Sequence, residues 1–246
     1  FMERGLARFA VVAVLTGAAV TGCEASDGSD GGILVLKNIH ADTGCVATSL
    51  DTETASSHGS LDLANAPGYL FIAQMRSRIT ALDGQEDQRT IITSGAKVDI
   101  TFPNSTIFSE DELASLKDQG LTHFKALFSV PIPPNEGLSD GPFTLIPSAL
   151  VEKIAEKIPT TSNVRLETVG TFTIVGDMSG TTVNSQPFSY AVTIGRHLNV
   201  SVLGPCSLPM GTAVRPGYAC NPYQDGVVDC CSQGSDTVCP ATVSTM

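Results

Sequence analysis

Two stretches in the second half of the chain, residues 164–174 and 188–194, alternate apolar and polar side chains with a period of two. In a β-strand, successive side chains point to opposite faces, so this period predicts strands with one buried and one wet face. Half-wet strands are typical of antiparallel sheets and not of the buried parallel sheet of an α/β enzyme. The predicted buried faces are Val164, Leu166, Gly170, Phe172 and Ile174 in the first stretch and Phe188, Tyr190, Val192 and Ile194 in the second.

Other short strands are predicted at residues 33–39, 69–75, 98–102 and 124–130, with Gly, Pro and Asp turn residues between them. The chain shows no βαβ alternation and no internal repeat. Roughly ten short strands of this kind predict a mainly β fold, an antiparallel β-sandwich of which the immunoglobulin-like type is one form.

Two short helices interrupt the strand pattern. Ser109 and Glu112 have the spacing of a capping box, and Gly120 follows at a suitable C-terminal position. The second helix is predicted from about Pro147 to Ile158, because apolar residues form one stripe and Pro159 stops the helix. Both helices are short enough to cover an end or edge of the sheets.

The N-terminal segment has the layout of an export signal: Arg4 and Arg8 precede an uncharged, mostly apolar run from Phe9 to Val20. This run is shorter than the about 20 residues of a membrane-spanning helix. Its end, Val20-Thr21-Gly22-Cys23, resembles the lipobox of bacterial lipoproteins. The resemblance implies cleavage between Gly22 and Cys23, diacylglycerol on the Cys23 sulfur and acylation of the new amino terminus. A secretory signal with a chance cysteine and a buried N-terminal helix are the alternatives.

The anchor predicts where the protein resides and what it meets. Residues 1–22 would be a signal peptide, and residues 23–32 would be the lipidated cysteine and a flexible Asp, Ser and Gly tether. The expected partners are the lipid bilayer, the lipoprotein processing and sorting machinery, and an unidentified envelope or extracellular molecule. Glu24, which is not an Asp, follows the cysteine and favours the outer membrane by analogy with enteric lipoproteins.

The charge balance excludes some partners. The chain has 14 basic and 25 acidic residues, and removal of Glu3, Arg4 and Arg8 with the signal peptide leaves 12 and 24, a net charge of −12. An acidic domain repels phosphate backbones and anionic headgroups, so nucleic acid is not expected as a partner.

Seven cysteines become six when Cys23 carries lipid. In the oxidising environment of an exported protein, six cysteines predict three disulfides, with 15 possible connectivities. A metal site is the alternative, but Cys230-Cys231 lacks the CxxC spacing and histidine partners that zinc favours. We therefore expect no metal and no cofactor. The six disulfide candidates are Cys45, Cys206, Cys220, Cys230, Cys231 and Cys239.

Residues 33–203 are assigned to the sandwich and residues 204–246 to a C-terminal module, which holds five of the six cysteines. The module is poor in apolar residues, so cross-links are expected to stabilise it. Its cysteine spacing resembles a knottin frame that lacks one cysteine. That resemblance implies the pairs Cys206 with Cys231, Cys220 with Cys239, and Cys45 with Cys230.

The order of lipobox, Gly-rich tether, GILVLKN strand, sandwich and terminal CNPYQDGVVDCC resembles a group of uncharacterised lipoproteins from gliding soil bacteria. This resemblance implies an envelope location. It implies no activity and no catalytic residue.

A serine hydrolase is the most specific enzymatic alternative. Residues 137–141 match the letters of GxSxG, with Ser139 as nucleophile, His197 as base and Asp177 or Glu167 as its orienting partner. The surrounding prolines and the missing parallel sheet disfavour this reading, and a Gly, Ser and Asp surface turn explains the same letters.

Histidines and acidic turns carry no clear metal motif. His40, His58, His123 and His197 show neither HxH nor HExxH spacing. The turns at residues 83–87 and 225–229 have carboxylates that could hold calcium, although acidic turns are common at surfaces. The sequence thus predicts a lipid-anchored cell-envelope protein that binds or makes structural contacts and is not an enzyme. The alternatives are a hydrolase using Ser139 and a protease-inhibitor-like module at residues 205–240.

Overall fold

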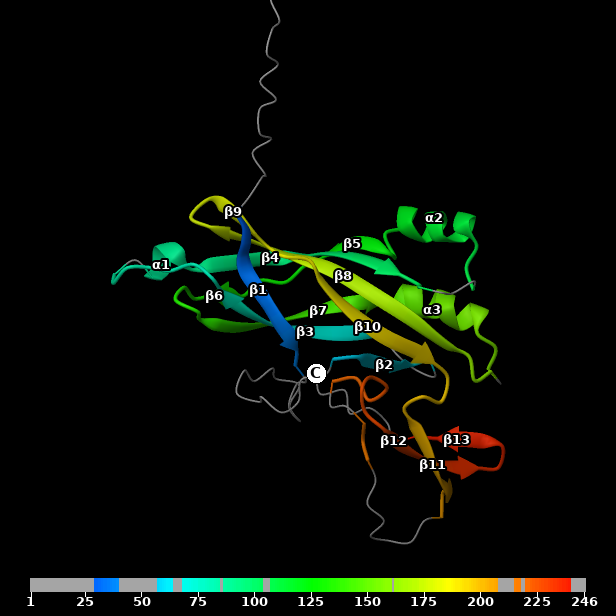
Figure 1. Cartoon of the computed structure of the whole chain (residues 1–246). Coiled ribbons are helices and arrows are strands. Elements are labelled where there is room, and N and C mark those ends of the chain that lie inside the picture. The colour runs from blue at the N-terminus through cyan, green and yellow to red at the C-terminus, as the bar shows by residue number, and fades with distance from the viewer. Residues whose placement is uncertain are drawn as a thin grey trace, which may run out of the picture.

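The computed structural model describes residues 29–39, 57–63, 68–84, 86–103, 107–160, 162–207, 215–217 and 220–239. This part of the chain is mostly β, as predicted, with a ten-stranded sheet of β1 to β10 and a three-stranded sheet of β11 to β13 (Figure 1). The strands are β1 (Ser29–Asn38), β2 (Gly59–Asp62), β3 (Gly68–Ser77), β4 (Ile91–Thr101), β5 (His123–Ala126), β6 (Pro131–Ile132), β7 (Leu138–Pro147), β8 (Arg165–Met178), β9 (Thr181–Ser185), β10 (Phe188–Gly195), β11 (Val200–Pro205), β12 (Val228–Gln233) and β13 (Asp236–Val238); the helices are α1 (Glu86–Arg89), α2 (Glu110–Asp118) and α3 (Ser148–Lys157).

Strand β8 connects the parts of the large sheet. One of its edges pairs antiparallel with β10 along residues 165–172 and then with β9 along residues 175–178. Its other edge pairs with β4 along residues 169–177. Beyond β9 the sheet continues through β1 and β3 to β7. The strands β1, β3 and β7 therefore form a second layer that is joined to the first through β9.

The two layers pack face to face through aromatic side chains. The ring of Phe71 on β3 lies 4.9 Å from that of Phe172 on β8 and 5.0 Å from that of Tyr190 on β10. The ring of Phe143 on β7 lies 5.0 Å from that of Phe172. The fold is therefore sandwich-like. Unlike the two separate sheets of an immunoglobulin sandwich, its layers belong to one continuous sheet.

The alternation predicted for β8 is present in the structure. Leu166, Gly170, Phe172 and Ile174 are buried, as is Thr168 on the same face, whereas the residues that alternate with them are exposed or half-buried. Val164 lies before the strand and is exposed. At Gly170 a Cβ atom would lie 2.7 Å from Cδ1 of Leu145 on β7, so the glycine allows the two layers to approach closely.

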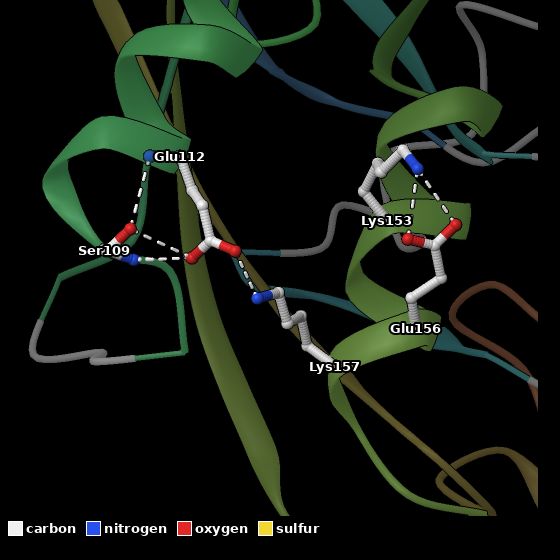
Figure 2. A network of polar contacts seen from close by, with 5 residues as sticks. All are labelled: Ser109, Glu112, Lys153, Glu156 and Lys157. Carbon is white, nitrogen blue, oxygen red and sulfur yellow. Dashed lines mark hydrogen bonds and ion pairs between the residues drawn. The ribbon is translucent and has the colours of Figure 1, made fainter.

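Both predicted helices form. The Ser109 hydroxyl accepts from the Glu112 backbone N–H at 3.3 Å and a Glu112 carboxylate oxygen accepts from the Ser109 N–H at 2.8 Å, so the capping box is complete (Figure 2). Helix α3 buries Leu150 and Ile154 of its apolar stripe. Lys157 of α3 forms an ion pair with the other Glu112 oxygen, which joins the two helices (Figure 2). This ion pair and the bond from the Ser109 backbone lower the pKa of Glu112 to about 2.

Strand β5 ends at Ala126, although the sequence predicts a strand up to residue 130. Its partner β4 has a bulge between Thr93 and Gly95, where the register of the pairing between β4 and β8 shifts. The Ala126 carbonyl lies 2.2 Å from the position of a Cβ at Gly95, so this bulge brings the two backbones into contact. Phe128 then stacks on Phe143 at 5.4 Å. Packing against β7 therefore replaces pairing with β4 at residues 127–129, and contact with β4 resumes where the Thr93 N–H donates to the Val130 carbonyl at 3.0 Å.

Three pairings in the described part are parallel and were not foreseen: β1 with β9, β2 with β10, and β11 with β12. Each joins strands that are far apart in the sequence, so no turn signal marks them. The one-turn helix α1 is likewise not predicted by the sequence, because residues 83–87 have the composition of an acidic turn.

Candidate functional site

The C-terminal module contacts the sandwich through residues 221–225, which we call the docking loop. The Gln224 side chain forms two hydrogen bonds with the backbone of Leu70 on β3: its carbonyl oxygen accepts from the Leu70 N–H at 2.8 Å, and its amide donates to the Leu70 carbonyl at 2.6 Å. The Asn221 amide donates to the Gly68 carbonyl at 2.8 Å. Side-chain amides of the docking loop thus form hydrogen bonds with backbone N–H and C=O groups at the start of β3.

The docking loop also covers strand β2. The Asp225 N–H donates to the Ser60 carbonyl at 3.0 Å, and the Asp62 N–H donates to the Tyr223 carbonyl at 2.9 Å. In addition, the Ser60 N–H donates to the Asp225 carboxylate at 2.6 Å. The loop therefore continues the hydrogen bonding of the large sheet beyond its β2 edge.

A buried cluster of hydroxyl, amide and carboxylate groups lies behind the docking loop. The Tyr69 hydroxyl donates to the Asp225 carboxylate at 2.6 Å. The Asn38 amide lies 3.2 Å from the hydroxyl oxygens of both Tyr69 and Tyr190. Burial, followed by the negative charge of Asp225, raises the pKa of Tyr69 well above 10. Tyr69 therefore keeps its proton and remains a donor to the carboxylate, and the cluster binds the module to the core of the sandwich.

The sequence predicts that Asp225 belongs to an acidic turn whose carboxylates could hold calcium. Asp225 instead has a backbone φ of +55° and a carboxylate that accepts from the sandwich. Among the described residues, no group of three or more His, Cys, Asp or Glu side chains could hold a metal ion. Nothing in the local sequence of residues 221–225 indicated that the loop would dock on β2 and β3.

The disulfides in the described part form between cysteines that the sequence predicts to be bonded. Only part of the implied pairing is correct. Cys206 pairs with Cys231, as the knottin resemblance implied. Cys230 pairs with Cys239, so the implied pairs Cys220 with Cys239 and Cys45 with Cys230 are wrong. Cys220 is also disulfide-bonded. The actual pairing follows from the sheet, because β12 carries Cys230 and Cys231 to opposite faces and each meets the partner on its own side.

The residues of the hydrolase alternative do not come together. Ser139 lies within β7, opposite Met75 of β3, and not at a turn between a strand and a helix. His197 follows the end of β10 at Gly195, which pairs with Arg165 at the start of β8. Asp177 lies twelve positions beyond Arg165 on β8. At about 3.3 Å per residue, the two residues are about 40 Å apart along the strand. Asp177 therefore cannot orient His197.

Glu167, the other proposed orienting residue, lies in an exposed group on the outer face of the sandwich. The Thr193 hydroxyl donates to the Glu167 carboxylate at 2.7 Å, and His58 Nε2 lies 2.6 Å from the same hydroxyl. His123 lies elsewhere on this face, 2.5 Å from Asp99. Sequence reasoning did not find the Thr193 group, because its members come from three separate strands or loops.

A shallow hollow of about 390 Å³ lies where β5, β7 and the start of α3 meet. Leu127 forms part of its wall and is 77% exposed. The residues that line the hollow are Phe124, Ala126, Leu127, Thr144, Pro147 and Ser148.

Several predicted site residues lie outside the described part of the chain: Gly22, Cys23, His40 and Cys45. No helix within the described ranges has the length and apolar character needed to cross a bilayer. Comparison with known proteins found no matching family model, no matching curated protein and no matching solved structure.

Proposed function

We propose that this protein is a lipid-anchored component of the cell envelope that acts by binding or structural contact, with its C-terminal module as the contacting part. The lipid would be attached to Cys23 after cleavage at Gly22, and the outer membrane is the proposed location. The lipobox-like residues 20–23 and the acidic, nucleic-acid-repelling composition support the proposal.

The observation that carries the proposal is the direction of β1. Its first residue, Ser29, pairs with Val183 of β9 at one end of the sandwich. Its last residue, Asn38, bonds Tyr69 in the cluster behind the docking loop. Ten residues of strand span about 33 Å, and Figure 1 shows β9 and the module at opposite ends of the molecule.

Because of this direction, the end of the sandwich that is nearest to Cys23 along the chain lies opposite the module. Cys23 precedes Ser29 by six positions, a reach of at most about 20 Å. A lipid on Cys23 would therefore lie nearest the β9 end. The sandwich then acts as a rigid spacer, and the disulfide-bonded module is presented away from the bilayer.

Intact mass of the protein purified from membranes of its host tests the anchor. The expected mass begins at Cys23 with added acyl groups, and Cys23→Ser is expected to abolish the acyl mass and the membrane association. Ser139→Ala is the matched control and should remain acylated. An unmodified mass that begins elsewhere would overturn the proposal.

A further inference from the structure

Strand β5 lies at the edge of the first layer of the sandwich. Among the described strands it pairs with β4 alone, so its other edge is open. The Ile100 N–H donates to the Thr122 carbonyl at 2.7 Å, and such hydrogen-bonded pairs alternate with non-bonded pairs along an antiparallel ladder. His123 and Lys125 fall in the non-bonded pairs, so their backbone N–H and C=O groups point to the open edge.

The hollow of about 390 Å³ lies beside this edge, on the side that faces the second layer. Phe124 and Ala126 of β5 line it together with Thr144 and Pro147 of β7, which is the edge strand of the second layer. Leu127, which directly follows β5, is 77% exposed at its rim. A strand added to the open edge of β5 would direct every second side chain into this hollow.

The opposite face of β5 carries an excess of positive charge. Lys125 lies directly opposite Lys97 on β4, and both side chains are exposed. Like charges at such positions repel each other and destabilise the ladder. In the described part of the chain, no ion pair includes either lysine, and the nearby Asp99 lies against His123. These two lysines are therefore uncompensated, although the chain has a formal net charge of −11.

We propose that the open edge of β5 binds an extended segment of a partner protein in which apolar residues alternate with acidic ones. The segment pairs antiparallel with β5, through the backbone groups of His123 and Lys125. Its apolar side chains enter the hollow, and its carboxylates face Lys97 and Lys125. The alternation is required because the hollow and the lysines lie on opposite faces of β5. This site depends neither on a lipid at Cys23 nor on the C-terminal module.

Charge determines which strands the edge accepts. A lysine on an edge strand opposes pairing with a neutral or basic strand. Carboxylates of an acidic segment replace the repulsion between Lys97 and Lys125 by attraction to both. A second copy of β5 would instead add further lysines to the same face, so the expected occupant is a different, acidic chain.

A labelled synthetic hexapeptide in which valine alternates with glutamate is the probe. Fluorescence anisotropy measures its binding to the full-length protein in detergent, and a peptide with lysine in place of glutamate is the control. We expect saturable binding of the acidic peptide and at least about tenfold weaker binding of the basic one. No saturable binding of the acidic peptide, or equal binding of the two peptides, would overturn the proposal.

Backbone methylation of the peptide tests the strand pairing. Residues opposite His123 and Lys125 share their face and are therefore the glutamates, whose N–H groups point to β5. Methyl groups on the glutamate nitrogens should weaken binding much more than methyl groups on the valine nitrogens, which point away. Equal effects of the two modifications would rule out pairing with this edge.

Lys125→Glu tests the charge on the protein side. The substitution places a carboxylate opposite Lys97, so it should not weaken the pairing of β4 with β5. Lys117→Glu, at an exposed site on α2, is the matched control with the same change in net charge. We expect about tenfold weaker binding for Lys125→Glu and less than about a twofold change for the control. Equal affinities of the two variants would contradict a role for the lysine pair.

Thr144→Trp tests the hollow, because the larger side chain on β7 occupies the space that valine would enter. Thr144 is exposed, so the core is not disturbed. Thr181→Trp, at an exposed position of β9, is the matched control. We expect about tenfold weaker binding for Thr144→Trp alone. Unchanged binding by this variant would show that the peptide does not use the hollow, against the proposal.

Discussion

The sandwich and the C-terminal module are both β-structures, but different interactions stabilise them. Thirty buried apolar side chains form one continuous core in the described part of the sandwich, whereas the described module buries only Tyr223, Val228 and Cys230 in its own cluster. Burial of apolar surface stabilises the first region, at about 25 cal/mol per Å². Disulfides, among them Cys206–Cys231 and Cys230–Cys239, and the docking loop stabilise the second.

This difference explains why the module lies against the end of the sandwich. A sheet of three short strands cannot bury enough apolar area to offset its ordering entropy. Cross-links reduce the entropy of the unfolded module, and hydrogen bonds from the docking loop position it on β2 and β3. We therefore expect damage to the core to unfold the whole protein, and damage to the module to remain local.

The largest effect is expected from Phe71→Ala. Phe71 is fully buried between the layers, so its truncation should lower the free energy of unfolding by about 3 to 5 kcal/mol. Denaturant unfolding followed by far-UV circular dichroism measures this loss. Leu127→Ala at an exposed site is the control and should change stability by less than about 0.5 kcal/mol. Equal effects of the two changes would refute the central role of the aromatic core.

Loss of a module disulfide should have the next largest effect. Replacing Cys230 and Cys239 together by serine should destabilise the module by about 2 to 4 kcal/mol. Amide hydrogen exchange should accelerate in β12 and remain unchanged in β8. The exposed Ser235→Ala is the control. Faster exchange in β8 to the same extent would mean that the two regions unfold as one unit.

Tyr69→Phe tests the link between the two regions. It removes the donor that lies 2.6 Å from the Asp225 carboxylate, at an expected cost of about 1 to 3 kcal/mol. Increased proteolysis of the module is the expected readout. Thr171→Val, which removes an exposed hydroxyl bond to Ser189, should have little effect. An unchanged rate of module cleavage in Tyr69→Phe would argue against the link.

The same tyrosine predicts an alkaline transition. Because the pKa of Tyr69 is raised in the folded state, its contribution to stability is fully present below the unfolded value of about 10. The contribution is lost as the pH rises through the higher folded-state pKa. Unfolding midpoints of the native protein and Tyr69→Phe, measured from pH 8 to 12, should therefore converge above about pH 10. A constant difference across this range would contradict the assignment.

The smallest effect concerns the exposed contact between α2 and α3. Glu112 should titrate at about 2, and Lys157→Met should move its pKa upward toward 4.5, because the ion pair favours the charged carboxylate. Carboxyl chemical shifts measured against pH give both values. Lys153→Met, which removes a contact within α3 alone, should leave the Glu112 pKa unchanged (Figure 2).

The elements that were predicted correctly depend on neighbours in sequence. The alternation of β8, the capping box at Ser109 and the stripe of α3 each involve residues at most a few positions apart. The end of β5 at Ala126 was missed because the cause lies in another strand, at the bulge around Gly95. The docking loop was missed for the same reason, since its polar side chains find their partners more than 150 positions earlier.

By itself, the sequence determined that this protein is mainly β, that two short helices form, and that its C-terminal region depends on disulfides. These conclusions rest on periodicity, caps and cysteine content, which act locally or through composition. Only the tertiary structure decided that β9 joins two layers of one sheet, that Cys230 pairs with Cys239, and that Asp177 lies far from His197. Strand order and the pairing of distant residues arise from long-range packing, which leaves no local pattern in the chain.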